Sequence, residues 1–351
     1  MITIKEIADL AGVSIGTVDR VLNHRGSVKK QTEEKILKII KDNNYATNAS
    51  GRSLSIQRKK IRIAYVYNTA PGNLFFNDIV DGMYEALKSY TQYNIQFIPV
   101  AVFSINPDDF IKTVNTLASS RHISGFILTT FFSRECAETV EKLHKKGIPI
   151  VTCNIDIDNS PRLSYVGCNY YNAGKLAAAA LSKIAHGEQS VAIIDIPWFY
   201  NDNNMPANRV SGFTDTLKNY PQFHIVSTSL VSAENEYDSY FRMRQLFSSH
   251  PEITSVFISS IAVSSFSKAI ADLNAKNKLT VISVDEFYDV KKAVLSGIID
   301  ATICQNAFWQ GSTALSILAN YIITRSQPKE RYFSNLEIKI RESFETESSS
   351  L

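Results

Sequence analysis

The first forty residues alternate apolar and polar side chains with the period of an α-helix. Thr3, with a glutamate three residues later, has the pattern of a capping box, so we expect a first helix to begin there. Gly12 suits the positive φ that ends a helix. Ser14 is then expected to cap a second helix that runs to about residue 22, and a third is expected over about 30–43. The residues predicted to face inward are Ile4, Ile7, Ala8, Ala11, Val18, Val21, Leu22, Ile36, Ile39 and Ile40.

The pattern changes from residue 61 onward. Short runs of β-branched and aromatic residues now alternate with longer segments of helical spacing. Alternation of this kind predicts parallel, doubly wound α/β sheets. The strands are too many for one sheet, so we expect two similar units that divide near 162–165. The predicted strands are IRIAYVY, IQFIPV, GFILTT, IPIVTC, LSYVGCN, SVAIIDI, FHIVSTS, SVFISS and LTVISVD.

The first two predicted helices, joined by a turn that contains glycine, form a helix-turn-helix. In this motif the second helix enters the major groove of DNA. Outward-facing Ile15 suits a thymine methyl group, and Arg20 can bind guanine O6 and N7, which is worth about 1–3 kcal/mol of discrimination. Asp19 could accept from cytosine N4, orient Arg20, or form a surface ion pair of little energetic value; the sequence leaves these alternatives open.

Charge is distributed unevenly along the chain. Residues 1–60 hold 12 Lys and Arg against 6 Asp and Glu, a net charge of +6, whereas the whole chain carries +3, so the other 291 residues carry −3. A basic N-terminal segment favours a polyanionic partner for that segment alone. A solvated charged helix is the alternative, because several of these charges are spaced as i,i+3 and i,i+4 pairs.

Several functional classes find no support in the sequence. No apolar run is long enough for a membrane span, and the N-terminus lacks the pattern of a secretion signal, so we expect a cytoplasmic protein. The four cysteines show no metal-binding spacing and are expected to be reduced, mostly buried thiols. No dinucleotide-binding loop, P-loop, nucleophile elbow or zinc-protease motif is present, so we predict no cofactor, no metal and no enzyme activity.

The N-terminal segment TIKEIADLAGVSIGTVDRVLNHRGSV, with KILKIIKDNNYATNASGRSL after it, resembles the lactose-repressor (LacI/GalR) family of bacterial transcription regulators. The resemblance implies that a hinge segment follows the third helix and wedges Leu54 into the minor groove. Two hinge positions depart from the family pattern, with Thr47 in place of proline and Gly51 in place of alanine. The residues expected to contact DNA are Thr3, Ser14, Ile15, Gly16, Thr17, Asp19, Arg20, Asn23, Lys29, Asn48, Arg52 and Leu54.

The rest of the chain resembles the same family's bilobed, periplasmic-binding-protein-like core, through blocks such as NRVSGF, VISVDEF and ATICQNAFWQGSTA. We therefore expect a helix-turn-helix domain over 1–46, a hinge and linker over 47–60, and an effector-binding core over 61–351. By analogy the chain crosses between lobes near 163, 287 and 322. The expected N-lobe is about 61–162 and 287–321, and the expected C-lobe about 163–286 and 322–345.

In the family, ligands bind between the two lobes, at the carboxyl ends of the strands. Arg209 and Asp285 match the charged pair that binds effector hydroxyl groups, and the aromatic pair Phe75–Phe76 follows the first strand. Other positions depart from the pattern: Asn154 replaces an aspartate, and the usual Asp–Asn pair after VG is Asn169–Tyr170. The residues expected to bind effector are Phe75, Phe76, Asn154, Trp198, Arg209, Asp285 and Gln305.

These expectations combine into one hypothesis with two alternatives. The hypothesis is a DNA-binding regulator that binds a palindromic operator as a homodimer and is controlled by a sugar or sugar derivative. We expect this regulator to be a repressor. The first alternative is a sugar-binding solute receptor without a regulatory role, which the basic N-terminal segment disfavours. The second is an enzyme on a doubly wound fold, which the absence of catalytic motifs disfavours.

Overall fold

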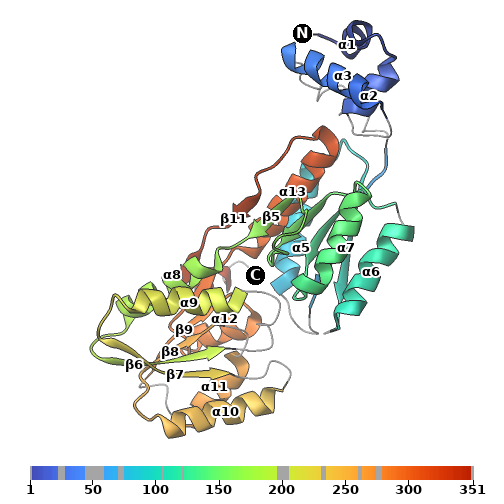
Figure 1. Ribbon diagram of the computed structural model, residues 1–351. Helices are drawn as coiled ribbons and strands as arrows, with labels where there is room; N and C mark the ends of the chain where they lie inside the picture. Colours follow the sequence, from blue (N-terminus) through green and yellow to red (C-terminus); the bar gives the residue numbers. More distant parts are fainter. Residues whose placement is uncertain are drawn as a thin grey trace. The chain divides into compact units, whose positions relative to one another are not determined.

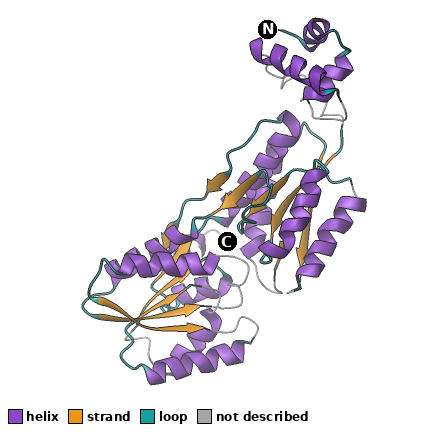
Figure 2. Ribbon diagram, in the orientation of Figure 1, coloured by secondary structure: helices purple, strands orange, loops and turns teal. Residues whose placement is uncertain are grey.

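Figures 1 and 2 show the protein as a computed structural model. The structure describes residues 2–22, 28–43, 59–69, 75–104, 106–120, 122–195, 205–230, 235–259, 263–273 and 279–348. The chain divides into two compact units, Met1–Ile56, here called the head, and Gln57–Leu351, the core.

The described part of the head consists of three helices, α1 (Ile4–Ala11), α2 (Ile15–Leu22) and α3 (Lys30–Asp42). The predicted capping box is confirmed, since the Thr3 side chain accepts from the Glu6 amide and the Glu6 carboxylate accepts from the Thr3 amide. Gly12 ends α1 at a φ of 69°. Ser14 caps α2 as expected, because its hydroxyl accepts from the Thr17 amide at 3.2 Å.

One small apolar cluster holds the three helices together. Its fully buried members are Ile7, Ala8, Ala11, Val18, Val21 and Ile36. Leu22, Ile39 and Ile40 also pack against this cluster but stay partly exposed. Lys35 of α3 donates to the Ala11 carbonyl at 3.0 Å, so a long-range hydrogen bond to the end of α1 supplements the apolar contacts.

The first sheet of the core has the strand order β11-β5-β4-β3-β1-β2, and all neighbouring pairs are parallel. We call this sheet and its helices the N-lobe. Helices α6 and α7 pack on one face, while α5 and α13 pack on the other (Figure 1). Its elements are β1 (Ile61–Asn68), α5 (Phe75–Leu87), η1 (Lys88–Tyr90), β2 (Ile95–Val102), α6 (Pro107–Ser120), β3 (Gly125–Thr129), α7 (Ser133–Lys145), β4 (Ile150–Cys153), β5 (Ser164–Gly167), α13 (Ala307–Thr324) and β11 (Arg331–Phe333).

The second sheet has the order β12-β10-β9-β8-β6-β7 and, with its helices, forms the C-lobe. It is parallel except for the edge strand β12, which is antiparallel to β10. Helices α8 and α9 cover one face, and α10, α11, α12 and α14 cover the other. Its elements are α8 (Tyr170–Ile184), β6 (Gln189–Asp195), α9 (Met205–Leu217), β7 (Phe223–Leu230), α10 (Glu236–Ser249), β8 (Ser255–Ile258), α11 (Val263–Asp272), β9 (Thr280–Val284), α12 (Tyr288–Leu295), β10 (Ala301–Cys304), β12 (Glu337–Lys339) and α14 (Arg341–Ser348).

The predicted fold class, helices followed by two doubly wound sheets, is confirmed, but the predicted lobe crossings are wrong. β5 still belongs to the first sheet, so the first crossing lies at 168–169 rather than near 163. β10 belongs to the second sheet and α13 packs on the first, which places the second crossing at 305–306 rather than near 287. β11 returns to the first sheet, so the third crossing lies at 334–336 and not near 322. The alternation of strands and helices cannot show this, because it carries no information about which sheet a strand joins.

Glycines allow close contact between two helices of the N-lobe. A Cβ atom at Gly82 of α5 would lie 2.0 Å from the carbonyl oxygen of Phe308 in α13. A Cβ atom at Gly311 of α13 would lie 1.8 Å from the carbonyl oxygen of Ile79 in α5. The two helix backbones therefore touch at positions where only glycine fits.

The C-lobe repeats this arrangement in helices α8 and α9. A Cβ atom at Gly174 of α8 would lie 1.9 Å from the carbonyl oxygen of Arg209 in α9. A Cβ atom at Gly212 of α9 would lie 1.9 Å from the carbonyl oxygen of Tyr171 in α8. This close packing fixes the position of the Arg209 backbone relative to α8.

Within the described residues, no helix combines the length and apolar character needed to cross a bilayer. The same residues contain no group of His, Cys, Asp and Glu that could hold a metal ion. None of the four cysteines forms a disulfide, and all four are buried. Burial raises the pKa of the Cys168 thiol to about 12, and it also raises the pKa of Cys153 and of Cys304. These thiols are therefore protonated at neutral pH.

We expect Gly311→Ala to lower the melting temperature of the core, because the added methyl group forces α13 away from α5; overpacking of this kind costs about 1–3 kcal/mol. Gly16→Ala is the matched control, since a Cβ atom at Gly16 would have only the Ser14 hydroxyl within 4 Å, at 3.8 Å. Calorimetric melts of both variants test the expectation. An unchanged core transition in Gly311→Ala would contradict the close contact.

Candidate functional site

The exposed face of α2 carries the side chains that were predicted to contact DNA bases. Ile15 is 49% exposed although it is a large apolar residue, and Gly16 and Arg20 are exposed beside it. Thr17 and Asp19 are partly buried. Because Val18 and Val21 occupy the buried side of the same helix, the exposed face is free to meet another molecule.

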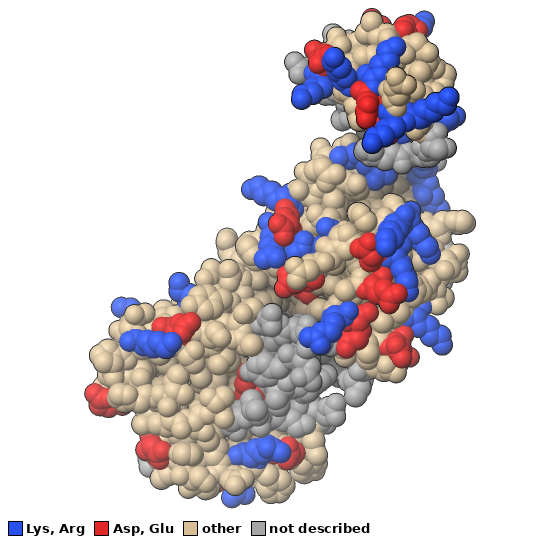
Figure 3. Space-filling model, viewed as in Figure 1, with Lys and Arg blue, Asp and Glu red and all other residues tan. Residues whose placement is uncertain are grey.

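The other predicted DNA contacts divide into three groups. Thr3, Ser14 and Thr17 are exposed or partly buried and also take part in local hydrogen bonds at helix starts. Lys29 is exposed directly before α3. Asn23, Asn48, Arg52 and Leu54 lie outside the described residues. On the face of the head visible in Figure 3, Lys and Arg side chains predominate over Asp and Glu.

In the core, Arg209 and Asp285 form a buried ion pair. Arg209 lies within α9, and Asp285 directly follows β9. The two residues are 3% and 7% exposed, and Arg209 Nη2 lies 3.8 Å from Asp285 Oδ2. Burial raises the pKa of Asp285, while the Arg209 charge and a hydrogen bond from Gln305 oppose this shift.

Three neighbours fix the Arg209 guanidinium. Its Nη1 donates to the Ser259 carbonyl at 2.6 Å, and its Cζ lies 5.3 Å from the centroid of the Tyr170 ring. Its Nε is buried and has no hydrogen-bond partner among the described residues. A buried N–H group without an acceptor is costly, so this atom is suited to donate to a bound ligand.

Asn154, which follows β4 of the N-lobe, is buried and has a φ of 63°. Its amide Nδ2 donates to Gln305 Oε1 and to Gln310 Oε1, each at 3.1 Å. Its backbone carbonyl accepts from the hydroxyl groups of Tyr165 and Tyr170, at 2.8 and 2.7 Å. Asn154 therefore joins the N-lobe to the second crossing and to the start of α8.

These hydrogen bonds continue through both lobes. Gln305 donates to Asp285 Oδ1 at 2.6 Å, and the Ser259 hydroxyl donates to Asp195 Oδ1 at 2.5 Å. We call the resulting series the inter-lobe polar chain; its members are Asn154, Gln305, Asp285, Arg209, Ser259 and Asp195. The structure thus brings together four of the residues predicted for the effector site, and each of the four contacts another.

The predicted aromatic pair lies at the start of α5. Phe75 and Phe76 are both buried, and their rings meet edge to face at 5.4 Å. Phe76 also contacts Tyr67, whereas Phe75 lies 5.3 Å from the ring of Phe287 in the C-lobe. Phe75 is therefore a second place where the lobes touch. Trp198, the remaining predicted residue, lies outside the described residues.

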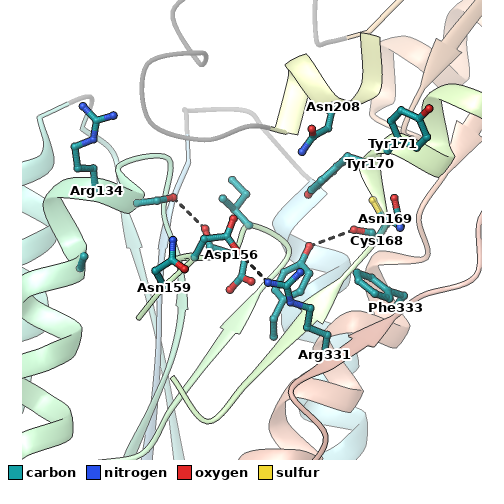
Figure 4. A pocket seen from close by; sticks show the side chains of 15 residues that line it. Arg134, Asp156, Asn159, Cys168, Asn169, Tyr170, Tyr171, Asn208, Arg331 and Phe333 are labelled. Atoms are coloured by element: carbon teal, nitrogen blue, oxygen red, sulfur yellow. Dashed lines mark hydrogen bonds and ion pairs between the residues drawn. The ribbon is translucent and has the colours of Figure 1, made fainter. Parts of the chain in front are cut away.

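A cleft of about 600 Å³ lies between the lobes beside the first and third crossings (Figure 4). Arg134 and Asn159 of the N-lobe line it on one side, and Asn169 and Asn208 of the C-lobe line it on the other (Figure 4). Tyr170 belongs to both features, since its ring lines the cleft and its hydroxyl bonds to the polar chain. The volume falls in the range of about 300–1,000 Å³ that is typical of small-molecule sites.

Sequence reasoning missed several residues of this region. Gln310 and Ser259 are buried and accept hydrogen bonds from the predicted residues Asn154 and Arg209, and the buried Asp195 accepts from Ser259. A polar residue at the carboxyl end of an apolar strand, as Asp195 is in β6 and Ser259 is directly after β8, is the one signal that could have identified them. Tyr170 was noted only as a departure from a family pattern, and nothing in its spacing predicts that it contacts both Arg209 and Asn154.

Two family models match the chain. One, described as a periplasmic binding protein domain, matches residues 63–326. The other, described as bacterial regulatory proteins of the lacI family, matches residues 3–48.

Similar proteins agree with both matches. The probable HTH-type transcriptional repressor ExuR of Bacillus subtilis is 27% identical over 295 residues, which cover 82% of each chain. The ribose operon repressor of the same organism is 25% identical over 93% of each chain. Among solved structures, GanP, a glucose-galactose binding protein from Geobacillus stearothermophilus, superposes with a TM-score of 0.72 at 20% identity, covering 81% of this chain and 99% of its own.

The structural likeness to GanP shows the fold of the core alone. The family is shown by the two family models, one matching the head and one matching the core, together with the relatives that span nearly the whole chain. Its members are regulators rather than enzymes. The chain therefore belongs to the lacI family of bacterial regulatory proteins, as a DNA-binding transcriptional regulator with a helix-turn-helix head and a periplasmic binding protein domain.

Proposed function

We propose that the protein is a repressor that binds a palindromic operator as a homodimer and is controlled by a sugar or sugar derivative bound in the core. Similar proteins are named as repressors, one of them of a ribose operon. GanP, whose core fold is the same, is named as a glucose-galactose binding protein. Because its partner is DNA, we place the protein in the cytoplasm.

The head is proposed to read DNA through the exposed face of α2. Ile15 and Arg20 are the base-reading residues, and Lys29 contacts the phosphate backbone. Phosphate contacts give affinity that falls steeply with salt, whereas base contacts give sequence preference. Asn48, Arg52 and the wedge residue Leu54 remain proposed contacts of the hinge in the minor groove.

The observation that carries the effector proposal is the geometry of Arg209 and Asp285. Their nearest charged atoms are 3.8 Å apart, beyond the usual hydrogen-bond range of about 2.7–3.2 Å, and Arg209 Nε has no acceptor among the described residues. A hydroxyl group can accept from the guanidinium and donate to the carboxylate at once. Adjacent hydroxyl groups on a sugar ring fit this pair, and the buried Phe75 and Phe76 supply apolar surface for the ring.

A second copy of the chain is proposed to cover an aromatic patch on the C-lobe. Tyr237 and Phe241 of α10 are 79% and 62% exposed, and Tyr288 at the start of α12 is 68% exposed. Helix α11 packs against both α10 and α12, so the three residues lie on helices that cover the same face of the C-lobe sheet. An exposed apolar patch of this kind marks a surface that another molecule covers. Because the proposed palindromic operator has two half-sites and needs two heads, we propose that this molecule is a second copy of the chain.

Arg20→Ala is expected to relax base preference at one position of each half-site, at a cost of about 1–3 kcal/mol. Lys29→Ala is the matched control, because losing a phosphate contact weakens all sequences alike and reduces the salt slope. Titrations against a set of operator variants at several salt concentrations distinguish the two effects. If Arg20→Ala weakened every sequence equally, Arg20 would not be reading a base.

Arg209→Lys is expected to lower effector affinity at least tenfold, since hydrogen bonds to charged groups are worth about 1.5–3 kcal/mol. Arg162→Lys is the matched control: Arg162 forms a largely buried ion pair with Asp156 at 2.5 Å, and Arg162 is not among the residues that line the cleft. Both variants should melt earlier than the parent, but only Arg209→Lys should lose the ligand. Mass spectrometry of natively purified protein identifies the ligand, and calorimetric titration measures its affinity for each variant. Equal ligand affinity in Arg209→Lys and the parent would remove Arg209 from the site.

Phe241→Glu is expected to shift the protein from dimer toward monomer in sedimentation equilibrium, because it places a charge in the aromatic patch. Ile184→Glu is the matched control: Ile184 is 36% exposed at the end of α8, on the opposite face of the same sheet. A Phe241→Glu protein that sediments like the parent would exclude the patch as the dimer contact.

A further inference from the structure

Tyr170 connects the proposed effector site to the opposite lobe. It is the first residue of α8 and is 9% exposed. Its ring lies against the guanidinium of Arg209, and its hydroxyl donates to the Asn154 carbonyl at 2.7 Å. Arg209 belongs to the C-lobe and Asn154 to the N-lobe. The Tyr170 side chain therefore contacts both Arg209, which is proposed to bind the ligand, and the opposite N-lobe.

The packing of α8 strengthens this connection. Gly174 lies one turn after Tyr170 on the same face of the helix. Its missing side chain allows the Arg209 backbone to rest against α8. Helix α8 thus holds Arg209 at two points, the backbone at Gly174 and the guanidinium at Tyr170. A displacement of Arg209 by a ligand must act on α8 and on its bond to Asn154.

The hydroxyl of Tyr170 is buried among protein atoms. Burial raises its pKa well above the usual range, so the group is protonated and remains a donor. A buried donor that loses its acceptor carries a large desolvation penalty. Separation of the lobes at this point must therefore either break the bond to Asn154 or admit water to replace it.

Tyr165 provides an internal comparison. Its hydroxyl donates to the same Asn154 carbonyl at 2.8 Å, but Tyr165 belongs to β5 of the N-lobe, as Asn154 belongs to the loop after β4. It donates also, at 3.3 Å, to the Cys168 carbonyl. The two tyrosines make the same chemical bond to one oxygen atom, and only the bond from Tyr170 crosses between the lobes.

We propose that Tyr170 is a positioning residue of the effector site, which holds Arg209 through its ring and couples ligand binding to lobe closure through its hydroxyl. The inference rests on the proposed function for the identity of the ligand, but the bond between the lobes exists without it. A ligand that binds one lobe arrangement more tightly shifts the population toward that arrangement. The hydrogen bond from the Tyr170 hydroxyl contributes to the free-energy difference between the arrangements.

The decisive experiment needs no ligand. Dyes are attached at Lys112→Cys on α6 and Lys218→Cys after α9, both at exposed positions, while the four native thiols are buried and do not react. Energy transfer between the dyes then reports the lobe equilibrium of the full chain. Tyr170→Phe is expected to shift this equilibrium roughly three- to tenfold, the value of one net hydrogen bond. Tyr165→Phe should match the parent.

Two outcomes would overturn the coupling role: equal shifts in the two variants, or no shift in Tyr170→Phe. Melting temperatures of both variants show that each is folded, and because each loses a hydroxyl on the same carbonyl, a general loss of stability would appear in both. A shift confined to Tyr170→Phe supports the proposal whether or not the ligand is a sugar.

A second measurement uses D-ribose as the probe and tests the role of the ring. Tyr170→Phe keeps the ring, so its affinity for D-ribose should change by no more than the roughly three- to tenfold shift of its lobe equilibrium. Tyr170→Leu loses the ring as well and should bind D-ribose at least about tenfold more weakly than Tyr170→Phe, because its cation–π contact with Arg209 is lost. Equal affinity in Tyr170→Leu and Tyr170→Phe would overturn the positioning of Arg209. If the parent itself does not bind D-ribose, that result counts against this ligand in the proposed function, and the dye measurement decides the role of Tyr170.

Discussion

A buried guanidinium and a buried carboxylate are tolerated only when partners inside the protein replace the water that each has lost, at a cost of several kcal/mol per ion. Arg209 and Asp285 impose this requirement on the core. Strand β9 and the left-handed turn after it place Asp285, and the close contact of α8 with α9 places Arg209. Gln305 satisfies the carboxylate and extends the hydrogen bonding to Asn154. As a result the lobes are joined at this point by polar groups whose geometry is specific, and a ligand that supplies its own hydroxyl groups can replace some of these bonds.

Local patterns in the sequence predicted the head well, because its helices depend on short-range features. A capping box, a glycine with positive φ and apolar residues at helical spacing are all found within the ten residues from Thr3 to Gly12, and the fold of the head adds little beyond packing its helices together. Strands β1 to β9 of the core were predicted for a similar reason, since continuous apolar runs indicate strands buried on both faces. The short strands β10, β11 and β12 were not predicted. The assignment of chain segments to lobes failed at β5, β10 and β11. These strands have four, four and three residues, and nothing in so short a run shows which sheet it joins.

The effector site could be predicted only in part. Resemblance to a family identified Arg209, Asp285, Asn154 and Gln305, and the structure brings them into one series of hydrogen bonds. It could not identify their present partners, because Gln310 and Tyr170 reach them through the geometry of the crossings, which the sequence located wrongly. The close contacts at Gly174 and Gly212 were equally invisible, since a glycine inside a helical pattern does not reveal which neighbouring backbone it admits.

The order of elements in the N-lobe has a consequence for how the protein is made. This lobe begins at β1 but requires α13 and β11, which follow the last parallel strand of the C-lobe. During synthesis the first five strands of the N-lobe therefore remain incomplete, with the edge of β5 unpaired and the surface beneath Leu318 uncovered, while strands β6 to β10 of the C-lobe are being made. Unpaired edges and uncovered apolar faces are what chaperones bind and what aggregates form from. A chain that stops shortly after residue 304 therefore lacks α13 and β11 of the first lobe as well as β12 and α14 of the second. The early half of the core is complete only after translation has passed β11.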